Sequence, residues 1–175
     1  NATGGVPGGG GSSPPLGSGG TTSESSGTCK RGIPFDRWVE PQPTLADLEA
    51  LSPQAFWFYN WTASPNPDLD YASRNFEFVP MVWNGDFDTQ ELINQIPDGA
   101  EYILGFNERM IAGQGGVDMT LEQVLARWPE VGNIADARGL TLLSPAMTFS
   151  NMPGREDGPE FMDAFMSACP TCRVD

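Results

Sequence analysis

Residues 102–108 have the sequence YILGFNE, a dense apolar run that ends in an amide and a carboxylate. Apolar runs without polar alternation are typical of parallel strands that are covered on both faces. We therefore predict a strand over residues 102–106, with Asn107 and Glu108 at its carboxyl end. In parallel α/β folds, the groups that perform chemistry gather at this end of the strands.

Runs of the same kind occur on both sides of this one, and helical patterns separate most of them. The other predicted strands are 31–35, 55–61, 76–83 and 140–147, with a short last candidate at 172–174. The predicted helices are 44–51, 89–96, a long segment that begins at Thr120, and one with Pro159 at its first position. This alternation of strands and helices predicts an α/β fold.

The long helix has clear signals at both ends and a helix breaker between them. Thr120 and Gln123 form a capping box at its start, and Gly139 provides a stop at its end. Pro129 lies in the middle of the segment. We expect it to break or kink the helix, because proline lacks an N–H and clashes with the preceding turn.

Two parallel architectures fit these elements. A doubly wound sheet suits the length of the folded part. An eight-stranded barrel needs about 250 residues, so the chain would hold only about its first five units and the start of a sixth. Length alone favours the sheet, and the residues at the strand ends favour the barrel.

Charge and composition exclude several classes of function. The chain has 9 Lys and Arg residues against 23 Asp and Glu residues, a net charge of −14, and no histidine. Such an acidic chain is a poor partner for nucleic acid or anionic membranes. The missing histidine excludes serine–histidine and cysteine–histidine catalysis and histidine zinc sites. No apolar run reaches about 18 residues, so we expect no membrane span. We also expect no cofactor, no bound metal and no obligate protein partner.

Residues 1–28 differ in composition from the rest of the chain. Of these 28 residues, 23 are Gly, Ser, Thr or Pro, and Glu24 carries the only charge. Such a segment has too little apolar surface to offset the entropy of ordering. We predict a disordered linker over 1–28 and a folded domain over 29–175. The Asn-Ala-Thr sequon at residues 1–3 suits glycosylation, and an unmodified spacer is equally compatible. Because the first residue is not Met, we expect that a signal peptide was removed or not included.

Aromatic rings and amides collect at the carboxyl ends of the predicted strands. Tyr59, Asn60 and Trp61 end the second strand, Trp83 ends the third, and Asn107 follows the fourth. Aromatic rings offer apolar platforms, while amides both donate to and accept from hydroxyl groups. A neutral ligand rich in hydroxyls, such as a sugar, would use both.

The three cysteines are Cys29, Cys169 and Cys172. A zinc site is disfavoured because it needs four ligands and the chain has no histidine. A redox Cys-x-x-Cys pair precedes a helix in thioredoxin-like folds, whereas this pair follows one. We therefore expect a structural disulfide, as in secreted proteins. Either Cys169 pairs with Cys172, or Cys29 pairs with one of them.

Several motifs occur together in an order that resembles one known family. The motifs lie at residues 30–32, 57–61, 78–83, 103–108 and 144–146, and the final segment 168–175 matches as well. Together they resemble the alkali-sensitive-linkage-type glycosyl hydrolase catalytic core, glycoside hydrolase family 128. The resemblance covers residues 29–175, which is the whole predicted domain.

The resemblance implies an α/β fold that is the N-terminal portion of a (β/α)8 TIM barrel, about five to six βα units long. It implies a secreted or cell-wall-associated glycosidase that cleaves β-1,3-glucan by a retaining mechanism with two glutamates. Glu108 would be the general acid/base, and Asn107 would bond the sugar hydroxyl next to the reacting carbon. The resemblance also makes Trp61 and Trp83 candidates for the substrate cleft, and the position of Tyr59 and Asn60 at the end of the second strand adds them as candidate substrate contacts.

Two features depart from the family pattern. Arg109 and Met110 follow Glu108, where the family usually has Pro-Asp. The family's nucleophile ends a seventh strand, and no residue of this chain matches it, so we expect the chain alone to be inactive.

Two other functions are alternatives to a glycosidase. A non-catalytic glucan-binding protein would keep the cleft without the reaction. A nucleotide-binding sheet would need a Gly-rich loop after its first strand, and residues 33–38 contain none.

Overall fold

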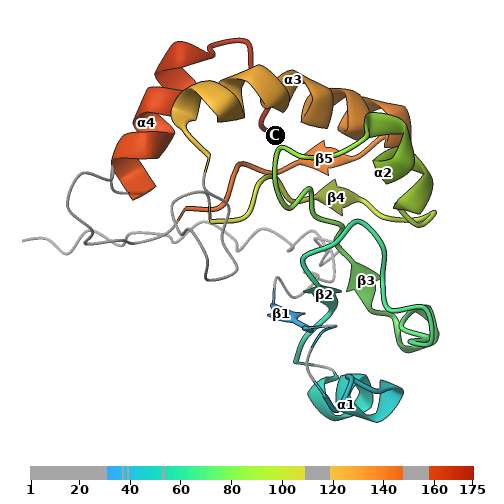
Figure 1. Ribbon diagram of the computed structural model, residues 1–175. Coiled ribbons are helices and arrows are strands. Elements are labelled where there is room, and N and C mark those ends of the chain that lie inside the picture. Colours follow the sequence, from blue (N-terminus) through green and yellow to red (C-terminus); the bar gives the residue numbers. More distant parts are fainter. Residues whose placement is uncertain (1–30, 37, 39, 53, 109–118, 148–157) are drawn as a thin grey trace, which may run out of the picture.

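A computed structural model describes residues 31–36, 38, 40–52, 54–108, 119–147 and 158–175. The predicted linker over 1–28, Cys29, Arg109 and Met110 lie outside the described residues. Within them the chain forms parallel strands and four α-helices, as the α/β prediction required (Figure 1). Among the described helices, none is long and apolar enough to cross a bilayer.

The first three strands form one parallel sheet in chain order. They are β1 (Gly32–Pro34), β2 (Trp57–Tyr59) and β3 (Glu77–Phe78). Gly32 pairs with Trp57 in this sheet. A Cβ at Gly32 would lie 2.0 Å from the Trp57 ring, so this aromatic can lie across β1 only because a glycine stands there. A Gly residue in the first strand is therefore a packing requirement of the second.

The last two strands, β4 (Tyr102–Ile103) and β5 (Thr141–Leu142), form a second parallel pair. Backbone hydrogen bonds connect it to the first sheet. The N–H of Val82 donates to Leu104 O over 3.0 Å, and the N–H of Leu104 donates to Pro80 O over 2.8 Å. The described strands therefore neighbour one another in chain order. A doubly wound sheet reverses its strand order at a switch point, and the described strands contain no such reversal.

The strands are shorter than the apolar runs that predict them, because the parallel hydrogen bonds continue past the regular ladder as single bridges and loop bonds. The predicted strand at 172–174 is wrong, since no strand forms there. Instead, the backbone of Asp175 follows β5, where its N–H donates to Leu142 O over 2.9 Å. One bond of this kind is too little for a ladder.

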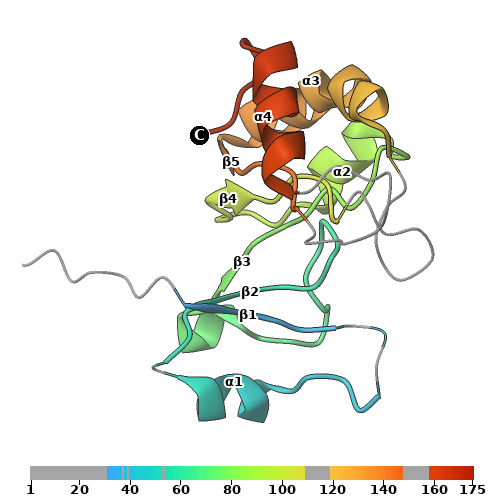
Figure 2. The same ribbon diagram turned by 90° about the vertical axis from the view of Figure 1, so that its left-hand side faces the viewer.

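The four helices are α1 (Leu45–Leu51), α2 (Thr89–Gln95), α3 (Leu121–Arg138) and α4 (Gly158–Ala168). Figures 1 and 2 show α1 beside the β1–β3 sheet, while α2, α3 and α4 cover β4 and β5 on one side. The described core has two parts accordingly. One lies around Phe58 and Leu48 under α1, and the larger one lies around Trp128 of α3.

Pro129 was predicted to break or kink the long helix. A break does not occur, because α3 continues through Pro129 from Leu121 to Arg138. An interior proline removes a backbone bond and costs about 3 kcal/mol. That cost is offset by burial on both sides, where Trp128 is 1% exposed and Val131 is fully buried. The predicted ends are confirmed: the Thr120 capping box is formed, and Gly139 ends the helix at a φ of 68°.

Trp128 connects the long helix to the end of β4. Its ring makes edge contacts with Phe106 at 5.7 Å and Phe165 of α4 at 5.2 Å between centroids. A Cβ at Gly105 would lie 2.6 Å from this ring, so the glycine in the YILGFNE run gives the indole its space. The indole Nε1 donates to Arg173 O over 2.8 Å. The backbone that leads to Asn107 and Glu108 is thus fixed against α3.

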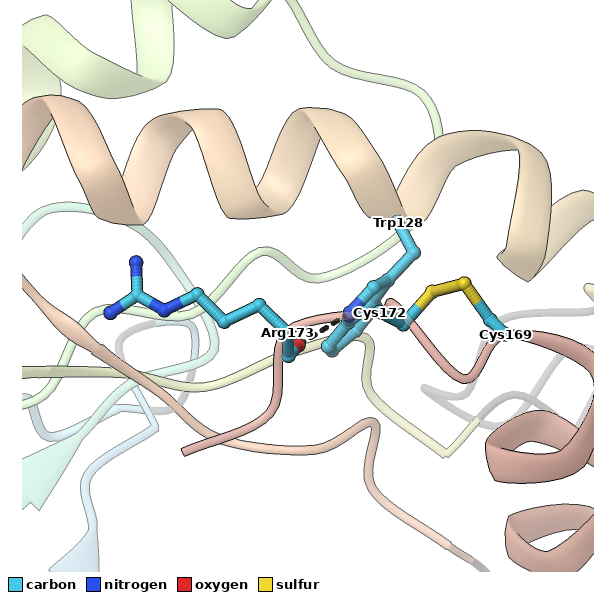
Figure 3. The surroundings of a disulfide bond; sticks show 4 residues. All are labelled: Trp128, Cys169, Cys172 and Arg173. Atoms are coloured by element: carbon cyan, nitrogen blue, oxygen red, sulfur yellow. Dashed lines mark hydrogen bonds between the residues drawn. A yellow bond between two sulfur atoms is a disulfide. The ribbon is translucent and has the colours of Figure 1, made fainter.

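The disulfide joins Cys169 and Cys172, one of the three pairings left open by the sequence. It closes the turn between α4 and the final residues, next to Trp128 (Figure 3). Arg173 follows it and donates to Leu140 O over 2.7 Å and to Asp175 Oδ2 over 2.8 Å. The final segment is therefore bonded to the backbone just before β5.

Candidate active site

A cavity of about 700 Å³ lies at the carboxyl ends of the strands. Its walls come from the segments that follow β1, β2, β3 and β4 and from helix α2. The lining residues are Asp36, Trp38, Trp61, Thr62, Ala63, Met81, Val82, Trp83, Asn84, Asp86, Phe87, Leu92, Gln95, Asn107 and Glu108. Three of the predicted site residues other than Glu108 therefore meet in one place: Trp61, Trp83 and Asn107.

Glu108 and Asn107 enter the cavity from the end of β4. The Asn107 N–H donates to Trp83 O over 3.0 Å, and the side chain is only 5% exposed. Glu108 is half-buried and lies on the cavity wall. The backbone bond from Asn107 to Trp83 fixes the position of the Glu108 backbone relative to the loop after β3. A carboxylate at this position is shielded on one side and open to a ligand on the other.

Tyr59 is the last residue of β2, and the charge of Glu108 acts on it. Burial, and secondarily the negative charge of Glu108, raise the pKa of the Tyr59 hydroxyl. Tyr59 does not line the cavity. Its link to the site is therefore the electrostatic effect of Glu108 on its hydroxyl.

Trp61 has an uncommon backbone conformation for a large residue. Its φ is 61°, in the left-handed region, which costs about 1–3 kcal/mol for a non-glycine residue. Its ring makes an edge contact with Tyr59 at 5.0 Å between centroids, and it lines the cavity. Strained backbone of this kind persists only where surrounding contacts enforce it.

Asn60 supplies those contacts. The residue is fully buried, and its Nδ2 donates to Ser64 O and to Asn66 Oδ1, each over 3.0 Å. Its Oδ1 accepts from the Thr62 hydroxyl over 2.9 Å. Asn60 is absent from the cavity lining, and its amide is used within the loop. It therefore positions Trp61 instead of reaching toward the opening.

The lining residues that the sequence did not indicate include two acids and two aromatic residues: Asp36, Trp38, Asp86 and Phe87. Trp38 is the most exposed large apolar residue among them, at 66%. Each follows a predicted strand by one to four positions, so their position just after a strand end is the signal that could have indicated them. Among the described residues, no cluster of three or more Cys, Asp or Glu side chains could hold a metal ion.

Comparison with known families shows which family the chain belongs to. The sequence pattern of the family described as glycosyl hydrolase catalytic core matches residues 36–175. The chain belongs to this family. The match includes every strand after β1 and every residue of the cavity lining described above. A comparison with curated protein sequences gave no match.

Solved structures of this glycosyl hydrolase family share its fold. A subgroup II family 128 endo-β-1,3-glucanase from Sorangium cellulosum is 36% identical, with a TM-score of 0.69 over 82% of this chain and 57% of its own. The corresponding enzyme from Pseudomonas viridiflava is 33% identical, with a TM-score of 0.68 over 84% of this chain and 57% of its own. A subgroup I endo-β-1,3-glucanase from Amycolatopsis mediterranei, in complex with laminaritriose, is 32% identical, with a TM-score of 0.54 over 70% of this chain and 46% of its own. The chain thus spans somewhat more than half the length of the first two enzymes.

Proposed function

We propose that this chain is the N-terminal part of a secreted, retaining endo-β-1,3-glucanase in which Glu108 is the general acid/base. The observation that carries the proposal is the position of Glu108, on the wall of a cavity of about 700 Å³ with Trp61 and Trp83 on neighbouring strand ends. Endo-β-1,3-glucanases are 36% and 33% identical to the chain and share its fold. The acidic net charge of −14 also suits a neutral polysaccharide better than an anionic polymer.

Glu108 would act first as an acid. A glycosidic oxygen is a poor leaving group, so a carboxylic acid must protonate it as the bond to the anomeric carbon breaks. A second carboxylate about 5 Å away would trap the oxocarbenium-like centre as a covalent glycosyl-enzyme. Glu108, now ionised, would then take a proton from the water that releases the sugar. We place the second carboxylate outside this chain, at the end of a later strand.

The aromatic and amide groups would hold the sugar. Trp83 is 37% exposed and Trp61 lines the same cavity, so both rings are accessible as platforms for apolar sugar faces. Asn107 is beside Glu108 and would bond the hydroxyl next to the reacting carbon. Asn60 would contribute through the loop that sets the Trp61 ring, and Tyr59 through its electrostatic interaction with Glu108.

The proposed complete fold is an eight-stranded TIM barrel of which these strands are the first part. Support comes from the chain order of the parallel strands and from the bonds that join 80–83 to 104–107. The carboxyl-end position of the cavity agrees with barrel enzymes in general. Closure requires further strands, so the 175-residue chain by itself should show no hydrolysis.

The test is glutamate-to-glutamine substitution in the intact protein with laminarin as substrate. Glu108→Gln should reduce release of reducing sugar by about 100-fold or more, because it removes the general acid, and laminari-oligosaccharide binding should persist. Glu101→Gln is the matched control, since Glu101 is exposed at the opposite end of β4. Full activity in Glu108→Gln would exclude the acid role, and binding without hydrolysis in the unaltered protein would favour a non-catalytic glucan-binding protein.

A further inference from the structure

A loop after β3 forms one wall of the cavity. Trp83, Asn84, Asp86 and Phe87 all line the cavity from this loop. Inside the loop, the N–H of Asp86 donates to Asn84 Oδ1 over 2.9 Å. One short bond between neighbours does not fix the loop relative to the rest of the wall. Its position depends on contacts from outside.

At Trp83 the Asn107 N–H holds the start of the loop, and the contacts to the rest of the loop include several from one side chain of the outer helix α3. Arg127 Nε donates to Gly85 O over 2.8 Å, and its Nη2 donates to Phe87 O over 2.9 Å. The guanidinium carbon also lies 4.2 Å from the centroid of the Phe87 ring. One planar cation therefore holds two carbonyls and one ring of the same loop. Bonds from a charged donor are stronger than neutral ones, and the fork of the guanidinium fixes direction as well as distance.

The arginine is itself held in place. Arg127 pairs with Glu130, one helical turn later. The second carboxylate oxygen of Glu130 accepts from the Thr89 hydroxyl, at the first position of α2, over 2.9 Å. The loop is thus fastened at Gly85 and Phe87 and again at the start of the helix that follows it. The Arg127 side chain is 29% exposed, so the cluster is partly shielded from solvent.

We propose that Arg127 is a positioning residue that sets the cavity wall at Trp83–Phe87 from outside the cavity, and thereby sets affinity for glucan. Arg127 does not line the cavity, so it acts on the ligand only through the loop. The inference about the ligand rests on the proposed function. The inference about the loop rests on the bonds above.

The chain contains a matched control at the other end of the same two helices. Arg138 of α3 donates to Ile96 O over 3.0 Å and pairs with Asp98 at 2.7 Å. It therefore fastens α3 to the segment after α2 with the same types of bond. That segment precedes β4 and lies at the amino end of the strand, away from the cavity. Arg138→Gln removes an equal charge and comparable bonds without touching the loop.

The experiment compares Arg127→Gln, Arg127→Lys and Arg138→Gln in the intact protein. Amide hydrogen exchange over residues 83–88 reports on the loop, and titration with laminaritriose reports on the ligand. In Arg127→Gln we expect exchange to rise and the Kd to increase about tenfold, or about 1.4 kcal/mol. Arg127→Lys keeps the charge and should restore part of both readouts. Arg138→Gln should leave the loop exchange and the Kd within about twofold of the unaltered protein, even if it lowers the Tm as much as Arg127→Gln does.

Unchanged loop exchange in Arg127→Gln would overturn the proposal, and so would an equal loss of affinity in Arg138→Gln. If Arg127→Gln fails to fold, Glu130→Gln weakens the same cluster more gently and should move both readouts in the same direction; no movement would overturn the proposal. If the unaltered protein does not bind laminaritriose while the loop still loosens in Arg127→Gln, the proposed function fails and the positioning of the loop stands.

Discussion

Replacing Gly105 by alanine tests the contact that fixes the end of β4. The added Cβ would lie 2.6 Å and 2.8 Å from two atoms of the Trp128 ring and 3.0 Å from the Pro145 nitrogen. The first two distances are shorter than a Cβ tolerates, and the third neighbour is backbone, which yields little. Trp128 is held on two sides by Phe106 and Phe165, so it has little freedom to withdraw. Overpacking of a filled core costs about 1–3 kcal/mol.

Gly132→Ala is the matched control for this substitution. Gly132 lies within α3, and nothing stands within 4 Å of a Cβ built there. The same methyl group should therefore stabilise the protein by about 0.5–1 kcal/mol, because alanine is the better residue in a helix. Urea denaturation of both variants measures the difference, with unchanged m-values as a check on the unfolded state. A Gly105→Ala protein as stable as the Gly132→Ala protein would refute the packing account of this strand end.

The remaining predictions concern the site and one partly buried acid, Glu77. The Tyr59 hydroxyl should titrate above its ordinary pKa of about 10, as followed by absorbance at 295 nm. Glu108→Gln should lower this pKa but leave it above the ordinary value, because burial is the larger cause. An unchanged pKa in this variant would contradict the electrostatic effect of Glu108 on Tyr59. Asn60→Ala should cost about 2–3 kcal/mol in thermal or urea unfolding, because it leaves buried partners in the loop unsatisfied, and a loss below about 0.5 kcal/mol would argue against its positioning of Trp61. Burial raises the pKa of Glu77, so its ionisation opposes folding: stability from this group is fully present below its unfolded pKa and is lost as the pH rises through the raised folded value. Glu77→Gln should therefore raise the Tm at pH 7 and not at pH 3, and an equal change at both pH values would contradict the shift.

Most strands and helices were predictable from the sequence because their signals are local. The apolar run at 102–106 and the capping box at Thr120 specify their elements within a few residues. The expected break at Pro129 failed because burial of Trp128 and Val131, which depends on residues far along the chain, outweighs the local cost. Strand lengths were overestimated because an apolar run continues where the regular ladder has already stopped.

The site was predictable only in part, because it depends on where side chains point. Asn107, Trp61 and Trp83 were found at strand ends and do line the cavity. Asn60 carries the same chemical groups at the same end of a strand, yet its amide turns into its own loop. Nothing in the local pattern distinguishes an inward from an outward amide. The contact between Arg127 and Gly85 spans 42 positions in the chain, so no local motif could have indicated it.

The most direct test of the central claim measures how the rate of hydrolysis by the Glu108→Gln variant depends on the leaving group of the substrate. In the intact protein, this variant would be given laminarin and, separately, a dinitrophenyl β-laminaribioside, whose leaving group departs without protonation. If Glu108 is the acid/base, laminarin hydrolysis falls by about 100-fold or more. The aryl glycoside then gives a stoichiometric burst of dinitrophenol, after which turnover stalls because no base activates water. Equal losses on both substrates, with no burst, would contradict the assignment of Glu108 as the acid of this glycosidase.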